Sequence, residues 1–149
     1  LGLPFAFAYH FDMGGVQVAL DLYRQHFEPS AALDAPYAIV TANVLAADTA
    51  DEAAYQAAPG QLMMLAIRTG RFAPLTSPEK AARNPDLVLA RSMASNRIIG
   101  DAGMVVEGLE QLQQMTGADE LMVTSVAYGI EARVRSLELL ARAWGLHSQ

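Results

Sequence analysis

The sequence has no cysteine among its 149 residues. This absence excludes a disulfide framework and every metal site built on thiolates, and it is typical of a protein from a reducing cytoplasm, where we expect this chain. No apolar run approaches the roughly 18–20 residues that a transmembrane helix needs, so we expect no membrane partner. The first residue is Leu1 and not methionine, from which we expect a processed or truncated product.

The sequence is also short of positive charge and of the common catalytic motifs. Lys and Arg number 10 against 16 Asp and Glu, a net charge of −6 with no basic cluster, so we expect no nucleic-acid partner. There is no glycine-rich dinucleotide fingerprint, phosphate-loop lysine motif, G-x-S-x-G elbow or H-E-x-x-H pair. These absences leave nucleophilic hydrolases and metalloproteases without support, and we expect no metal site.

Apolar residues, in contrast, are abundant. They make up 52% of the chain, while charged residues make up only 17%, well below the usual quarter. A chain of this length buries about 68–70% of its unfolded surface, which is enough for one sizeable core. The low content of charged residues nevertheless indicates that too few of them are available to cover the surface. We therefore expect apolar surfaces that this chain does not cover by itself.

Hydrophobic periodicity predicts strands alternating with helices. Strands are expected at 5–9, 37–46 and 121–126, and helices at 16–27, 48–68 with a break at Pro59-Gly60, 100–116 and 130–144. The second strand lacks polar alternation, which is typical of a parallel strand covered on both faces. One face of the last helix carries Ile130, Val134, Leu137, Ala141 and Trp144.

The segment 70–96 has no such periodicity. It contains three prolines and at most a short helix at 86–94. An irregular stretch of this length inside a compact domain is usually functional or disordered.

The order of elements favours right-handed crossovers and a parallel sheet. A closed eight-stranded barrel needs about 250 residues, so this chain has room for roughly three of eight strand–helix units. We place these units at residues 1–35, 36–118 (including the excursion 70–96) and 119–149. The expected fold class is therefore α/β, with about three parallel strands and an incomplete architecture.

Four segments in this order resemble the C-terminal part of the bacterial luciferase-like, flavin-dependent monooxygenases: residues 1–11, 23–30, 36–49 and 116–124. The resemblance implies the C-terminal part of a TIM (β/α)8 barrel, completed by oligomerisation or by the missing barrel half. Two features depart from the family. Gly100-Asp101-Ala102-Gly103 replaces a Gly-Ser/Thr-Pro-Glu-like cap, and the first five strands, which supply most of the flavin site, have no counterpart.

The resemblance also implies a chemistry. Such an enzyme oxygenates a small organic substrate with O2 and reduced flavin mononucleotide (FMN), which a separate flavin reductase supplies; the chain alone is expected to be inactive and to bind FMN poorly. Barrel sites lie at the C-terminal ends of the strands. This selects His10 as the catalytic candidate, and as pocket-lining candidates Tyr9, Phe11, Asn43, Ser125 and Tyr128. In the family, the segment corresponding to 70–96 can be a mobile lid; a disordered insertion is the alternative.

Simpler alternatives remain open for these residues and for the chain. His10 can be a histidine satisfied by backbone at the barrel rim, and Asn43, which needs a partner if buried, can tie neighbouring backbone together. The chain as a whole can be a non-catalytic α/β module that self-associates through a bare sheet face. A doubly wound nucleotide-binding fold is disfavoured, because the first strand leads into Tyr9-His10-Phe11-Asp12 and not into a glycine-rich turn.

Overall fold

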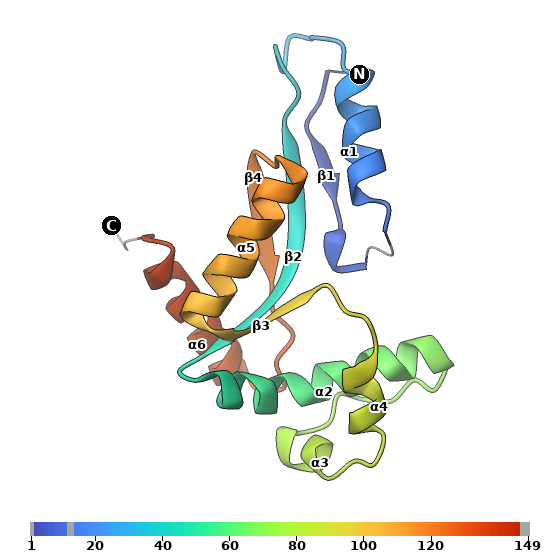
Figure 1. Cartoon of the computed structure of the whole chain (residues 1–149), viewed down its shortest axis with the longest axis vertical. Coiled ribbons are helices and arrows are strands. Elements are labelled where there is room, and N and C mark those ends of the chain that lie inside the picture. Colours follow the sequence, from blue (N-terminus) through green and yellow to red (C-terminus); the bar gives the residue numbers. More distant parts are fainter. Residues whose placement is uncertain (1, 12–13, 147–149) are drawn as a thin grey trace.

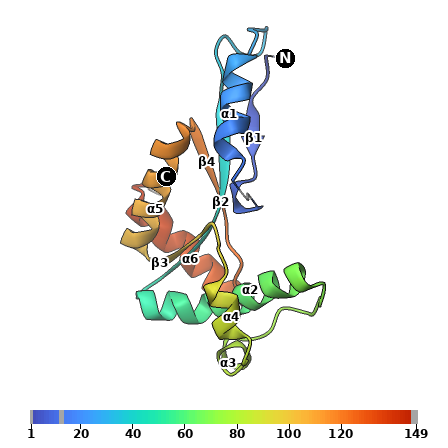
Figure 2. The same cartoon turned by 45° about the vertical axis from the view of Figure 1, so that its right-hand side comes forward.

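The computed structural model of this chain describes residues 2–11 and 14–146. Their elements, in order, are β1 (Phe5–Phe7), a 3-10 turn η1 (Tyr9–Phe11), α1 (Val16–Gln25), β2 (Ala38–Ala47), α2 (Ala50–Thr69), α3 (Pro78–Ala82), α4 (Leu87–Ser92), β3 (Arg97–Asp101), α5 (Ala102–Thr116), β4 (Glu120–Thr124) and α6 (Ile130–Ala143). Figures 1 and 2 show an elongated molecule, with β1 and α1 at one end of β2 and α2, α3 and α4 gathered at the other.

β2 is the central strand, and every strand pairing within the described residues is parallel. β4 pairs with β2 along Ile39–Asn43, β1 along Ala38–Val40 and β3 along Asn43–Ala47. Because a strand has only two edges, β4 occupies one edge while β1 and β3 follow each other along the other. The prediction of an α/β fold with parallel strands is confirmed, and the sheet is open.

The number of strands was predicted incorrectly, because β3 was not expected. Its sequence, Arg-Ile-Ile-Gly-Asp, is only five residues long and combines two isoleucines with residues that disfavour strands. Pairing with the buried half of β2 overrides this weak local preference. The preceding segment holds the expected short helix, α4, and also α3, which begins with a Ser77 N-cap and Pro78 in its first turn.

The predicted break at Pro59-Gly60 was also wrong, since α2 continues through both residues. Thr49 caps the helix by accepting a hydrogen bond from the Glu52 backbone N–H, and Gly70 ends it at a φ of 69°. Pro59 removes one intrahelical hydrogen bond. Burial of Pro59, Gly60 and the preceding alanines against β3 and the α3–α4 segment offsets that loss.

The two faces of the sheet are covered unequally. Alternate residues of β2, from Val40 to Ala46, pack with α1, α5 and α6 in the main core. On the opposite face, α2 covers only the C-terminal end of β2, at Leu45 and Ala47. The rest of this second face, here called the inner face, carries Ala6, Ile39, Thr41, Asn43, Arg97, Met122 and Thr124, which the strand registers place on one side. Within it Met122 is 49% exposed, so no described element covers this part of the sheet.

A second uncovered surface lies on α6. The face that the periodicity identified remains outside the core, because Ile130 is 65% and Val134 46% exposed, whereas Ser136 and Leu140 are buried. We call this face the α6 stripe; its members are Ile130, Val134, Leu137, Ala141 and Trp144. The chain exposes 9105 Å² in all, against about 7,400 Å² for a compact monomer of its mass. This excess of about 1,700 Å² agrees with the high apolar and low charged content of the sequence, from which uncovered apolar surface was expected.

Candidate functional site

A polar cluster lies on the inner face where three strands meet, and in it Asn43 is buried while Arg97 and Thr124 are half-buried. Asn43 of β2 is level with Arg97 of β3 on one side and with Thr124 of β4 on the other. Arg97 Nε donates to Asn43 Oδ1 at 2.9 Å, and Asn43 Nδ2 donates to Thr124 Oγ1 at 3.2 Å. These two bonds fix the orientation of the amide. Asn43 therefore ties neighbouring strands together in the middle of β2, level with the first residue of β3 and the last residue of β4. Parallel α/β proteins bind ligands at the C-terminal ends of strands, and of these three strands β4 ends at this level.

The guanidinium of Arg97 is the dominant charge of this cluster. Its Nη2 lies 3.4 Å from the Val126 carbonyl oxygen, while its Nη1 is buried without a hydrogen-bond partner. The group lies against α2, where a Cβ atom at Gly60 would come within 2.6 Å of Nη1. Burial lowers the pKa of the Arg97 guanidinium from its ordinary value, yet arginine stays protonated in proteins. The inner face thus holds a partly buried positive charge.

The turn η1 brings two predicted residues to the same edge of β2. β1 stops pairing at Val40 and β3 starts at Asn43, which leaves a gap in that edge. His10 occupies it, with Nδ1 3.4 Å from the Thr41 carbonyl oxygen. Asn96, just before β3, donates to the Tyr9 carbonyl oxygen at 3.0 Å. His10 therefore has a backbone partner, as expected if its role is structural. That partner, Thr41, lies two residues before Asn43 in β2.

The other predicted residues lie further apart. Phe11 is 68% exposed, and its ring contacts that of His10 with centroids 4.2 Å apart. Ser125 follows β4, and its Oγ is buried without a partner. Tyr128 is exposed beside a groove of about 410 Å³ at the C-terminal ends of β2 and β4. Tyr128 makes no hydrogen bond or ring contact with His10 or Asn43 in the described part of the chain, so a shared pocket for these residues stays a prediction.

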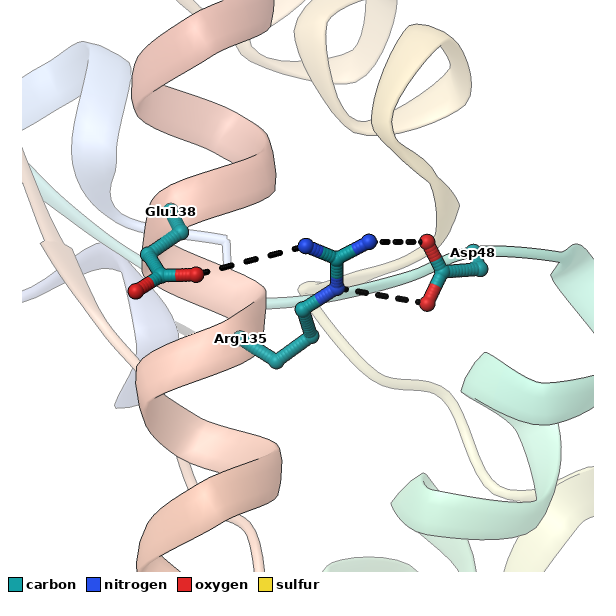
Figure 3. Close-up of polar contacts among 3 residues, drawn as sticks. All are labelled: Asp48, Arg135 and Glu138. Carbon is teal, nitrogen blue, oxygen red and sulfur yellow. Dashed lines mark hydrogen bonds and ion pairs between the residues drawn. The ribbon is translucent and has the colours of Figure 1, made fainter.

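An ion pair borders this groove. Arg135 of α6 donates through Nη2 and Nε to the two carboxylate oxygens of Asp48, and its Nη1 lies 4.0 Å from Glu138 Oε2 (Figure 3). The hydrogen bond from Arg135 lowers the pKa of the Asp48 carboxyl. The pair joins the loop after β2 to the helix after β4 at an exposed site. Its position indicates a structural role, in which the ion pair links this loop to this helix beside the groove.

The described residues contain neither a metal-binding cluster nor a helix that could cross a membrane. Over 2–11 and 14–146, no group of three or more His, Asp or Glu side chains is placed to hold a metal ion. Within the same ranges, none of the helices combines the length and apolar character needed to cross a membrane.

Sequence reasoning missed Arg97, the residue on which the cluster depends. Arg97 stood next to the irregular segment and was not recognised as part of a strand. The available signal was its position directly before two isoleucines, a charged residue entering an apolar run.

Known proteins are similar to this chain over nearly its whole length. No protein-family model matches the chain. A luciferase-like monooxygenase of Escherichia coli K12 is 37% identical over 146 residues, covering 93% of this chain and 43% of its own length. The uncharacterized protein YvbT of Bacillus subtilis is 37% identical over 155 residues, covering 97% of this chain and 44% of its own length.

Solved structures give the same relationship. The chain superposes on apo-MsnO8 with a TM-score of 0.88 and 29% identity, over 100% of this chain and 47% of that one. The FMN complex of the oxygenating constituent of 3,6-diketocamphane monooxygenase from Pseudomonas putida gives a TM-score of 0.56 at 18% identity, over 96% of this chain and 42% of that one. The latter likeness supports the fold alone.

The chain therefore has the fold of one part of a larger parallel α/β protein, and it spans less than half the length of the relatives it matches. The family that it resembles is the luciferase-like monooxygenases, as the sequence indicated.

Proposed function

We propose that this chain is the C-terminal part of a luciferase-like monooxygenase that uses reduced FMN and O2 to oxygenate a small organic substrate. The observation that carries the proposal is the open inner face. A polar cluster lies on it at the level where β4 ends, in a chain that matches such proteins over nearly its whole length. We expect the remaining barrel units to complete the site.

The residues of the inner face suit a flavin. Asn43 presents an amide of fixed orientation, whose second Nδ2 hydrogen can donate to a carbonyl oxygen of an isoalloxazine ring, and Arg97 adds a positive charge with a buried nitrogen that has no partner. When bound, FMN supplies the oxygen-activating chemistry, while the protein orients it and excludes water. In this proposal His10 exchanges a proton with the reacting group, and Tyr9 and Phe11 shield the same edge.

The uncovered surfaces support completion of the barrel by further polypeptide. The chain exposes about 1,700 Å² more than a compact monomer of its mass, and the inner face and the α6 stripe are two surfaces that no described element covers. Stable protein–protein interfaces bury about 1,200–2,000 Å² in total over both partners. A second copy or the missing barrel half can supply the cover. The alternative function, a self-associating module without catalysis, uses the same surfaces and is favoured by the exposed α6 stripe.

We extend the proposal to the segment 70–96 as a lid over the completed site. Its helices α3 and α4 pack on α2 through Ala81 and Leu87, while Phe72 and Val88 are 78% and 80% exposed. Exposed apolar side chains beside a site suit closure over a substrate and exclusion of water. The amides of this segment should gain hydrogen-exchange protection when FMN binds, and unchanged exchange would count against a lid.

The first experiment measures the solution size of the purified chain and titrates it with FMN by fluorescence. We expect a dimer or larger species without tight FMN binding. A well-behaved 16.0 kDa monomer that binds FMN tightly would overturn the proposal that the chain is an incomplete barrel.

The second experiment fuses the chain to the portion of the E. coli relative that lies outside the matched region. The fusion should bind FMN and oxidise substrate in the presence of a flavin reductase. His10→Ala in the fusion should lower kcat by about 10²–10⁴-fold, the usual contribution of a proton-transfer group. His26→Ala is the matched control, because His26 is exposed and its ring Nδ1 contacts only the Leu22 carbonyl oxygen of its own helix. If the fusion binds FMN and His10→Ala matches the control, the catalytic role of His10 is excluded.

A further inference from the structure

We propose that Arg97 is an anion-binding residue, whose guanidinium takes an oxyanion group, phosphate or carboxylate, of the ligand that occupies the inner face. This inference rests on the proposed function in one respect, that the inner face is a ligand site. It adds the chemical class that the site selects.

The guanidinium of Arg97 has more hydrogen-bond donors than acceptors. A guanidinium has five N–H groups. Arg97 uses Nε on Asn43 Oδ1 and one hydrogen of Nη2 on the Val126 carbonyl oxygen. Nη1 has no acceptor, so three N–H groups are unfilled. Buried polar groups are normally satisfied, and a forked donor of this kind is best filled by a planar oxyanion.

No carboxylate among the described residues forms an ion pair with Arg97. Both acceptors of Arg97 are neutral oxygens, and neither ion pair found among the described residues includes it. The acidic residues on the same strands have other partners. Asp101 of β3 caps α5 by accepting from the Met104 backbone N–H, and Glu120 of β4 accepts from the Tyr37 hydroxyl at the far end of the sheet. Charges withdrawn from water are normally paired, and we assign the opposite charge of the partly buried Arg97 to a bound anion.

Helix α2 packs against one side of the Arg97 guanidinium. Gly60 of α2 lies so close that a Cβ atom there would be 2.6 Å from Nη1 and 2.9 Å from Nη2. The helix therefore backs the group and excludes water from one side. Nη2 is held loosely, since its 3.4 Å contact with Val126 is at the long limit of a hydrogen bond. The loosely held Nη2 is therefore the nitrogen whose present contact a bound anion would replace most easily.

The test uses inorganic phosphate and acetate as probes of the chain at constant ionic strength. The readout is the nitrogen–proton NMR signal of Arg97 Nε, assigned by its loss in Arg97→Lys, together with the unfolding temperature. Phosphate or acetate at millimolar concentration should shift the signal. At ten times the dissociation constant it should raise the unfolding temperature by roughly 3–6 °C. Arg97→Met should abolish this rise, and Arg97→Lys should retain part of it.

Arg71→Met is the matched control, because Arg71 is an exposed arginine outside the sheet; it should respond like the unmodified chain. A wild-type chain that responds to neither probe overturns the proposal without depending on any variant, as does an Arg97→Met chain that responds fully. A stronger response to phosphate identifies a phosphate group as the natural anion, and a stronger response to acetate identifies a carboxylate.

The fusion protein separates this inference from the proposed function. If the fusion binds FMN and oxidises substrate but Arg97→Met alters neither FMN nor substrate affinity, the anion role fails and the function stands. If the chain responds to phosphate through Arg97 but the fusion never binds FMN, the anion site stands and the function fails.

Discussion

Ser136 offers the most direct test of how this fold is held together. Its side chain is fully buried in α6, and its Oγ accepts the backbone N–H of Ala46 at 2.8 Å. β4 ends its pairing at Asn43 of β2, so Ala46 has no strand partner on that edge. The hydroxyl of Ser136 thus continues the hydrogen bonding of β2 beyond the last residue of β4.

Ser136→Ala should leave that backbone N–H buried and unsatisfied. The cost of such a group is about 1–3 kcal/mol, and the lost oxygen is too small to create a substantial cavity. For a chain of this size 1 kcal/mol corresponds to roughly 2–4 °C, so the unfolding temperature should fall by about 2–12 °C.

Chemical denaturation followed by circular dichroism measures this difference. Ser92→Ala is the control, because the Ser92 hydroxyl donates to the Leu89 carbonyl oxygen at an exposed helix end; it should change stability by less than about 0.5 kcal/mol. Equal stabilities of the two variants would show that the Ala46 N–H finds another partner, and would refute the reasoning.

Two further predictions concern a helix end and the ion pair. Gly117→Ala should destabilise by about 1–2 kcal/mol, because this residue ends α5 at a φ of 58° that favours glycine. Gly103→Ala is the control in the same denaturation assay and should not destabilise, because Gly103 lies within α5 without a positive φ and an added Cβ would meet only Asp101 Oδ1, at 3.4 Å. The lowered pKa of Asp48 contributes stability above the carboxyl's unfolded pKa, and that contribution is lost as pH falls through its folded pKa. Asp48→Asn should therefore flatten stability measured between pH 5 and 2, by a small amount because the pair is exposed, and an unchanged slope would contradict the assignment.

Local sequence signals predicted the elements whose own residues determine them. α5 begins at Asp101, whose side chain caps it, and stops at Gly117, as expected from capping chemistry. β3 and the continuity of α2 through Pro59 depend instead on tertiary contacts. Periodicity identified the residues that share a face of α6, but it could not tell whether anything covers that face.

The candidate site was only partly predictable for the same reason. Asn43 was noticeable as a polar residue in an apolar strand, and the structure shows the partners that such a residue requires. Arg97 became significant only when β3 was seen to lie beside β2, because its importance comes from burial and from the lack of an acidic neighbour. Such properties arise from long-range pairing, which a single sequence does not display.

The central position of β2 has a consequence for how the protein comes apart. Its ten residues contact all three other strands, α2, α5 and α6, so its amides become accessible only when the whole fold opens. β1 pairs with β2 through only three residue pairs at one end, while α1 packs on the core through Leu20 and donates from Arg24 to the carbonyl oxygens at the end of α5. Opening free energies differ across a structure according to such contacts. Amide exchange and proteolysis should therefore begin in β1 and α1, while β2 keeps its protons until the last of its neighbours has detached.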